Sequence, residues 1–251
     1  MMNVRFASIV SAALLLFMSG PAIGQEYVEF KSQQDHFGLT FPVQPKVTEI
    51  TYTSQFGAPL RARVYSAESG RSRFIATVVD YSNLEALLTE KAKSCPPGAE
   101  TCRGGGSSTG AGYWKADMAG AVIYATAQLM KRDAKVEYFG WNNINLVEGH
   151  QVTLINSDKS KTSAAIYMHE NRLYILEGTV PPGYPVADFF PQSVEWLDEK
   201  GDSIRYETLY HHGLPKPPVG RGGGGGGGGG GQGQGGRGGR GGNQGSAPQP
   251  Q

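Results

Sequence analysis

The segment 163–180 constrains the fold more than any other part of the chain. It contains two apolar runs, 164–168 and 173–176, separated by the polar turn His169-Glu170-Asn171-Arg172. Two short apolar runs around a polar turn predict a β-hairpin. Successive side chains of a strand point to opposite faces, so both faces of the second strand receive apolar residues: Leu173 and Ile175 on one, and Tyr174, Leu176 and Val180 on the other.

A sheet with two apolar faces needs a cover on each, because neither face can remain in contact with water. The hairpin is therefore predicted to lie at the centre of a three-layer body, to which the rest of the chain contributes neighbouring strands and covering layers. The segment 74–79 is apolar at almost every position. That pattern favours a place beside the central hairpin.

Alternation of apolar and polar residues predicts further strands. The more polar runs 47–53 and 62–66, joined by a turn around Gly57-Ala58-Pro59, predict a partly exposed hairpin. The other predicted strands are 27–30, 37–41, 136–139, 151–155 and 204–210.

Three segments have the periodicity of helices. Ser82-Asn83-Leu84-Glu85 has the form of a capping box and predicts a helix over 83–94. A second helix ending near Arg132 is predicted, although Ile123-Tyr124 is also compatible with the start of a strand; its apolar positions are Met118, Ala121, Val122, Ala125 and Leu129. A third is predicted over 186–197. Because strands outnumber helices, the expected class is α+β with a largely antiparallel sheet.

Three stretches resemble the PsbP-like fold of small exported bacterial proteins, many of them uncharacterised. They are Phe37-Gly38-Leu39-Thr40-Phe41-Pro42-Val43-Gln44-Pro45, the strand 173–180 followed by Pro181-Pro182-Gly183, and the predicted helix with Phe189, Phe190 and Trp196. Val43 stands where such proteins often have glycine. The resemblance implies an antiparallel sheet with helices packed on both faces, an α/β/α sandwich, and a binding or accessory role. It transfers no catalytic residue.

The N-terminus has the layout of a secretory signal peptide. Arg5 precedes an apolar run over 9–18, which is followed by Gly20-Pro21 and by the small residues Ala22 and Gly24. The run is shorter than the roughly 20 apolar residues that a membrane-spanning helix needs. Cleavage after Gly24 is predicted, and it would leave a periplasmic or secreted protein that begins at Gln25 and has no membrane span.

The C-terminal residues 220–251 are predicted to form a disordered, glycine-rich tail. Ten consecutive glycines, from Gly222 to Gly231, are followed by repeats of glycine, glutamine and arginine. Such a segment has almost no side chain to bury and cannot offset the entropy of ordering. The predicted organisation is a signal peptide at 1–24, a single globular domain at 25–219 and the tail at 220–251.

The charge distribution argues against nucleic acid as a partner. The chain has a formal net charge of +1, but four of its positive charges, Arg5, Arg221, Arg237 and Arg240, lie in the two ends, which leaves the body at −3. Arg-Gly-Gly units at Arg237 and Arg240 resemble those of RNA-binding proteins. Three arginines without an aromatic residue, in an exported chain, predict only weak, salt-sensitive contact with anionic envelope polymers.

Cys95 and Cys102 are the only two cysteines and flank the turn Pro96-Pro97-Gly98. In an oxidising compartment, two cysteines this close in sequence are predicted to form a disulfide rather than a metal site. Closing so small a loop stabilises the fold by about 2.5 kcal/mol.

The glycine-rich loop 104–112 contains Gly106-Ser107-Ser108-Thr109-Gly110, which has the spacing of a hydrolase nucleophile elbow centred on Ser108. The elbow requires a preceding strand, whereas a cysteine loop and three glycines precede this motif, so a plain loop is the favoured interpretation. A phosphate cradle is disfavoured as well, because the Gly-Lys-Ser/Thr ending is absent.

Two tryptophans are candidate ligand contacts. Tyr113-Trp114 and Trp141-Asn142-Asn143 bring aromatic rings together with amide side chains, a combination that stacks on and hydrogen-bonds to sugars or peptides. Core packing is the alternative for both.

The five histidines, His36, His150, His169, His211 and His212, are interpreted as surface residues near strand ends. Only His211 and His212 are adjacent, and the spacing predicts no further metal ligand beside them. No catalytic residue, metal site or cofactor is predicted.

These observations favour a non-enzymatic envelope protein whose body binds a partner protein or a small ligand, with an accessory role. A serine hydrolase acting through Ser108 is the alternative enzyme hypothesis, and a structural cell-surface component is the third.

Intact-mass measurement of the exported protein, without reduction, is expected to give a chain that begins at Gln25 and contains the Cys95–Cys102 disulfide. Signal peptidase removes residues 1–24, and the oxidising compartment joins the two thiols. Retention of the apolar N-terminal segment would contradict the first expectation, and two thiols that react with an alkylating reagent would contradict the second.

Overall fold

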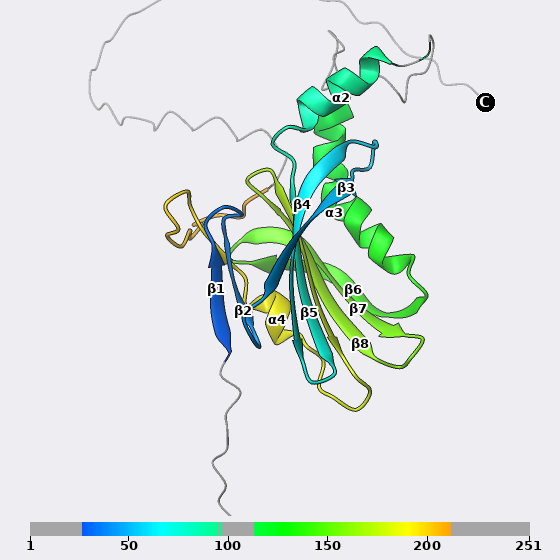
Figure 1. Cartoon of the computed structure of the whole chain (residues 1–251), viewed down its shortest axis with the longest axis vertical. Coiled ribbons are helices and arrows are strands. Elements are labelled where there is room, and N and C mark those ends of the chain that lie inside the picture. Colours follow the sequence, from blue (N-terminus) through cyan, green and yellow to red (C-terminus); the bar gives the residue numbers. More distant parts are fainter. Residues whose placement is uncertain (1–26, 95, 97–112, 212–251) are drawn as a thin grey trace, which may run out of the picture. The chain divides into compact units, whose positions relative to one another are not determined.

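The computed structural model describes residues 27–94, 96 and 113–211, and two antiparallel sheets make up most of this part (Figure 1). The larger sheet has the strand order β3-β4-β5-β9-β8-β7-β6, with bounds in that order of Lys46–Thr53, Pro59–Ser69, Ser72–Asp80, Arg172–Val180, Lys161–His169, Val147–Asn156 and Ala134–Ile144. The smaller sheet has the order β1-β2-β10, with bounds Val28–Ser32, Phe37–Phe41 and Glu195–Trp196. The helices of the described part are α2 (Leu84–Lys93), α3 (Tyr113–Met130) and α4 (Phe189–Gln192).

The predicted central hairpin is confirmed, and it consists of β8 and β9. The two strands pair antiparallel, with His169 opposite Arg172. Glu170 and Asn171 form the two-residue turn and have positive φ angles of 45° and 61°. Two successive positive φ angles are those of a type I′ turn, whose twist matches that of the flanking strands. β9 also pairs with β5, so the segment 74–79 lies beside the hairpin as predicted.

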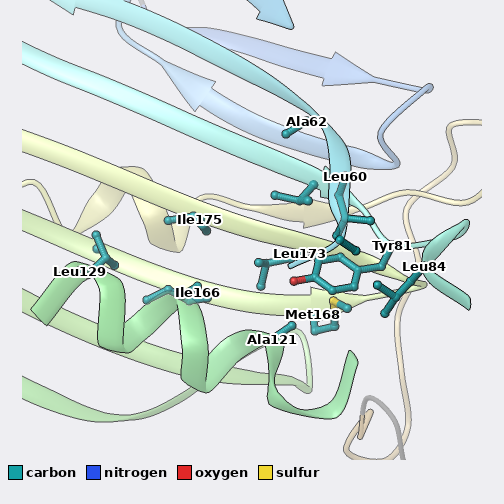
Figure 2. Packing of buried hydrophobic residues seen from close by; sticks show 14 of the residues in the cluster. Leu60, Ala62, Tyr81, Leu84, Ala121, Leu129, Ile166, Met168, Leu173 and Ile175 are labelled. Atoms are coloured by element: carbon teal, nitrogen blue, oxygen red, sulfur yellow. The ribbon is translucent and has the colours of Figure 1, made fainter. Parts of the chain in front are cut away.

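Both faces of the hairpin are buried. One face packs under α2 and α3 (Figure 2), and its contacting residues include Ile166, Met168, Leu173 and Ile175 of the hairpin and Leu84, Ala121 and Leu129 of the helices. The other face packs under the smaller sheet and α4, and its contacting residues include Ala165, Tyr167, Tyr174 and Leu176 of the hairpin and Phe37, Phe41, Phe190 and Trp196 of the cover. The hairpin therefore has two covering layers, as predicted.

The predicted kind of cover is wrong for one of the two layers. The α/β/α sandwich, with helices packed on both faces of an α+β sheet, is contradicted because α2 and α3 cover one face only, while the smaller β-sheet covers the other. The reason lies in β2, whose Phe37, Leu39 and Phe41 all point inward and are buried. This strand supplies enough apolar area to serve as the cover itself. The described part is consequently dominated by β-structure.

Two C-terminal elements also differ from the prediction. The helix expected over 186–197 is limited to the single turn α4, after which Glu195 and Trp196 pair with β2. The segment 204–210 is not a strand, although Tyr210 forms an isolated bridge with Val147. Its alternating residues therefore do not continue a ladder.

The first two predicted helices are confirmed as α2 and α3, but the predicted capping box is wrong. Asn83 rather than Ser82 is the N-cap residue of α2, and its side chain makes no capping hydrogen bond. The backbone N–H of Ser82 instead donates to Asp80 Oδ1 at 2.9 Å. Along α3, the predicted apolar positions Ala121, Ala125 and Leu129 are buried.

A buried carboxylate joins the two sheets. Asp35, in the turn between β1 and β2, accepts hydrogen bonds from the Arg63 guanidinium and from the Tyr65 hydroxyl, both on β4. The Tyr174 hydroxyl of β9 donates to the Asp35 carbonyl at 2.7 Å. The Asp35 side chain is 2% exposed, so its charge is compensated by Arg63 rather than by water.

Replacing Asp35 by alanine is expected to destabilise the protein by about 3 kcal/mol, because the Arg63 charge would remain partly buried without its partner. The matched control is Glu49→Gln, since Glu49 lies 3.8 Å from Arg63 but is 81% exposed. The control is expected to cost less than about 1 kcal/mol. Urea unfolding measures both values, and equal losses would contradict a special role for Asp35.

Candidate functional site

The two candidate tryptophans have different environments. Trp114 lies in the first turn of α3, is half-buried and packs against the core beneath the helix. Lys115 Nζ lies 5.3 Å from the centroid of its ring. Trp141 lies on β6 and is 67% exposed. No ring contact joins the two side chains within the described residues, so they do not form one site.

β6 is an edge strand with an unusual surface for such a position. It has eleven residues and pairs with β7, and no second partner strand is found in the part of the chain that the structure describes. Its exposed side chains include the large apolar residues Val136, Tyr138, Phe139 and Trp141. Exposed apolar edge strands invite pairing with another chain, and proteins usually protect them with charge, proline or a covering element.

The cross-strand register places Phe139 and Trp141 on the same face as α3. Phe139 is opposite Val152, which belongs to the core beneath α3, and Trp141 is opposite His150. A register shift at Glu137 brings Val136 to this face as well, because it lies opposite the core residue Leu154. A bulge of this kind redirects side chains at a sheet edge.

A chain of contacts connects these aromatic residues to α3. The Phe139 ring lies edge-on to the His150 imidazole, with 5.3 Å between centroids. His150 Nδ1 lies 2.9 Å from Thr126 Oγ1 of α3. Val136, Phe139 and Trp141, which share this face of β6, are named the β6 surface below.

The tautomer of His150 follows from the hydrogen bonds of Thr126. The Thr126 hydroxyl donates its single proton to the Val122 carbonyl at 2.8 Å. Its oxygen therefore accepts from His150, which carries its proton on Nδ1 and leaves Nε2 unprotonated. Burial lowers the pKa of His150 below its ordinary value of 6.5, because desolvation penalises the charged ring. The imidazole that packs against the Phe139 ring is thus neutral.

The two asparagines after Trp141 lie on opposite faces. Asn143 shares the face of Phe139 and Trp141 and is exposed. Asn142 points to the other face, where its amide nitrogen donates to the Tyr167 hydroxyl at 2.9 Å. The Asn143 amide is therefore the one that lies beside the β6 surface, and the Asn142 amide has a structural contact.

The opposite edge of the larger sheet is different. β3 is also exposed along its length, and Val47 and Ile50 are its exposed large apolar residues. Lys46 and Glu49 add charges to this edge, and its one aromatic residue, Tyr52, is half-buried and packs against the core. Charged side chains are one usual protection of an edge, and β6 carries a similar pair, Lys135 and Glu137. The two edges thus differ in their aromatic content.

The histidines are less uniform than the sequence indicated. His169 is fully buried, its Nε2 lies 2.7 Å from the Tyr206 hydroxyl, and its ring lies against Trp196, so the surface interpretation is wrong for this residue. His211 is exposed and contacts the Glu148 carboxylate. His212 lies outside the described residues.

Several predicted features fall outside the described residues. These are the cysteine pair Cys95 and Cys102, the glycine-rich loop with Ser108, the signal peptide and the tail. Within the described residues, no cluster of three or more potential metal ligands occurs. No helix in these same ranges has the length and apolar character needed to cross a bilayer.

Phe139 was not among the candidate residues, although it lies on the same face of β6 as Trp141. The two residues are two positions apart, which places them on one face of any strand, so the sequence contains this signal. The bulge at Glu137 that brings Val136 to the same face carries no local signal.

A scan against protein-family models and a search of curated proteins give no match to this chain.

Acidification is expected to destabilise the wild-type protein more than the His150→Gln variant. The folded-state pKa of His150 lies below the unfolded value, so the unfolded chain binds an additional proton between the two values. The stability that neutral His150 contributes is complete above about pH 6.5 and is lost as the pH falls toward the folded-state pKa.

Urea unfolding between about pH 8 and pH 5 measures this difference. The other four histidines are common to both proteins, so the gap between the two curves reports on His150 alone. Parallel curves over the whole range would contradict the assignment.

Proposed function

We propose that the folded body is a non-enzymatic, exported binding module, and that its β6 edge binds an extended segment of a partner protein by strand addition. The observation that carries this proposal is an eleven-residue edge strand that exposes Phe139 and Trp141. The outer backbone N–H and C=O groups of such an edge supply hydrogen bonds, and its side chains supply selectivity.

The exposed aromatic side chains of β6 favour a role of this edge in binding a partner. Tryptophan and tyrosine are enriched among the residues that dominate binding energy at protein interfaces, and Trp141 and Tyr138 lie on opposite faces of β6. An added strand would place its own side chains alternately beside the two faces. Phe139 and Trp141 would pack against one set, and Tyr138 would pack against the other.

A polypeptide partner fits the surface better than a sugar does. Sugar binding usually combines an aromatic platform with several converging polar groups, and the Asn142 amide is already engaged by Tyr167. A partner strand needs fewer polar side chains because the β6 backbone supplies the hydrogen bonds.

The support beneath β6 favours a pre-formed site. β6 pairs with β7 over nearly its whole length, and His150 and Thr126 link its aromatic face to α3. A rigid edge loses little conformational entropy when it binds, which favours affinity.

Site-specific photo-crosslinking in the native envelope tests the proposal. The variant Tyr138→p-benzoylphenylalanine on β6 is expected to capture one defined segment of a partner protein. The matched variant Thr48→p-benzoylphenylalanine on β3 is expected not to capture that segment. A synthetic peptide of the segment is then titrated against the purified protein.

In that titration, Trp141→Ala is expected to weaken peptide binding by about 2 kcal/mol, because it removes a central aromatic contact. Ile50→Ala, which removes an exposed apolar side chain from β3, is expected to leave the affinity unchanged. N-methylation of a peptide bond removes its N–H donor. It is expected to abolish binding at those alternate positions whose N–H groups pair with β6, and not at the positions between them.

Three outcomes would contradict the proposal. The first is equal capture of the same segment from both edges. The second is unchanged affinity after N-methylation at every position, which would exclude strand addition. The third is capture of a second copy of this chain alone, which would make β6 a self-association surface.

A further inference from the structure

A second site lies across the larger sheet from β6, at the turn between β4 and β5, and strands β9, β8 and β7 lie between β5 and β6. It is a pocket of about 450 Å³, which falls in the range of small-molecule sites. Five segments of the chain line it: Tyr27 just before β1, the end of β2, the β4–β5 turn, the end of β9, and the loop that leads into α4 with the first two residues of α4.

Aromatic rings form much of this pocket. Phe74 and Phe190 form its buried part, with ring centroids 5.3 Å apart. Tyr27 and Phe189 lie edge-on at 6.1 Å on the exposed side. Tyr184 also lines the pocket and is 59% exposed, and Phe189 is 62% exposed. Large rings held at the surface around a hollow mark a ligand site more often than a scattered apolar residue does.

The wall that carries Tyr184 is fixed by local backbone geometry. The Tyr184 N–H donates to the Pro181 carbonyl at 3.2 Å, and Gly183 has a φ of +84°, a conformation that side-chain-bearing residues rarely adopt. Farther along, Ala187 packs directly on β9 at Gly178, where a Cβ would lie 2.7 Å from the Ala187 methyl group. The loop is thus anchored at both ends, and the pocket is pre-formed.

One positive charge stands at this apolar pocket. Arg71 belongs to the two-residue turn Gly70-Arg71 and lines the pocket. No carboxylate lies within ion-pair distance of it among the described residues, and no aspartate or glutamate lines the pocket. Asp158 lies near enough for its pKa to be lowered in part by Arg71, but the larger causes are hydrogen bonds from Ser160.

We infer that this pocket binds a small carboxylic acid with an apolar body, whose carboxylate pairs with Arg71 and whose apolar part packs against the aromatic rings. A guanidinium pairs with a carboxylate through two parallel hydrogen bonds, which fixes the orientation of the ligand. The hydroxyl groups of Thr40 and Ser72 also line the pocket. The inference is independent of the β6 surface, since the two sites share no residue.

Titration of the ¹⁵N-labelled exported protein with octanoate tests the inference, with 1-octanol as the uncharged probe of equal chain length. Octanoate is expected to give saturable amide shifts centred on Gly70, Arg71, Ser72 and the segment 184–190. Arg71→Gln is expected to weaken octanoate binding about fivefold, the size of an exposed ion pair, and to leave 1-octanol binding unchanged.

Two further variants separate charge from packing. Phe189→Ser removes an exposed ring and is expected to weaken both probes, without loss of the folded spectrum. Arg73→Gln is the matched control, because Arg73 is also exposed and lies two residues from Arg71 but does not line the pocket. It is expected to leave both affinities unchanged.

Three results would overturn the inference. Shifts centred outside the pocket, or no saturable shift at all, would remove the site. Equal effects of Arg71→Gln and Arg73→Gln would show nonspecific attraction of the anion. Binding of an N-acetylated dipeptide that ends in phenylalanine, without binding of octanoate, would assign the pocket to a polypeptide C-terminus instead of a small acid.

Discussion

Burial of both faces of the β8–β9 hairpin is the constraint on which the rest of this structure depends. Tyr167 and Tyr174 are fully buried on one face, and Ile166 and Leu173 are fully buried on the other. Each side chain of this size stabilises the fold by roughly 1.5–3 kcal/mol when it leaves water. Neither layer alone can provide that burial. The helices and the smaller sheet must therefore both be in place before the hairpin is stable.

The same core extends to the proposed binding edge through Trp196. The centroid of its ring lies 5.0 Å from that of Tyr174 and 5.5 Å from that of Tyr167. Its indole N–H donates at 3.0 Å to the carbonyl of Ile144, the last residue of β6. A two-residue strand thus connects the hairpin, the smaller sheet and the end of β6. This connection explains how a long edge strand keeps a defined position although most of its side chains are exposed.

The sequence predicts those parts of the fold that are encoded within one segment. The hairpin, its neighbour β5 and the periodicity of α3 can all be found by local pattern, because strand alternation and helical spacing are local. The cover formed by β2 could not, since Phe37 pairs with Trp196 across a long stretch of chain. The candidate site, too, can be predicted from the sequence only in part. Trp114 and Trp141 carry the same local signal, and only packing distinguishes half-buried Trp114 from exposed Trp141.

A sheet that is covered on both faces leaves only its two edges open to a strand partner, and here the two edges are not equivalent. β3 carries two charged residues, Lys46 and Glu49, and no aromatic residue is among its exposed large apolar side chains. β6 likewise carries two charged residues, Lys135 and Glu137, but Glu137 is paired with Lys161 at 3.0 Å, and this strand exposes Tyr138, Phe139 and Trp141. Selection against aggregation would remove Phe139 and Trp141 from an edge that had no partner. Their presence on β6, and the absence of exposed aromatic residues on β3, are therefore the strongest physical reason to seek a partner strand at β6.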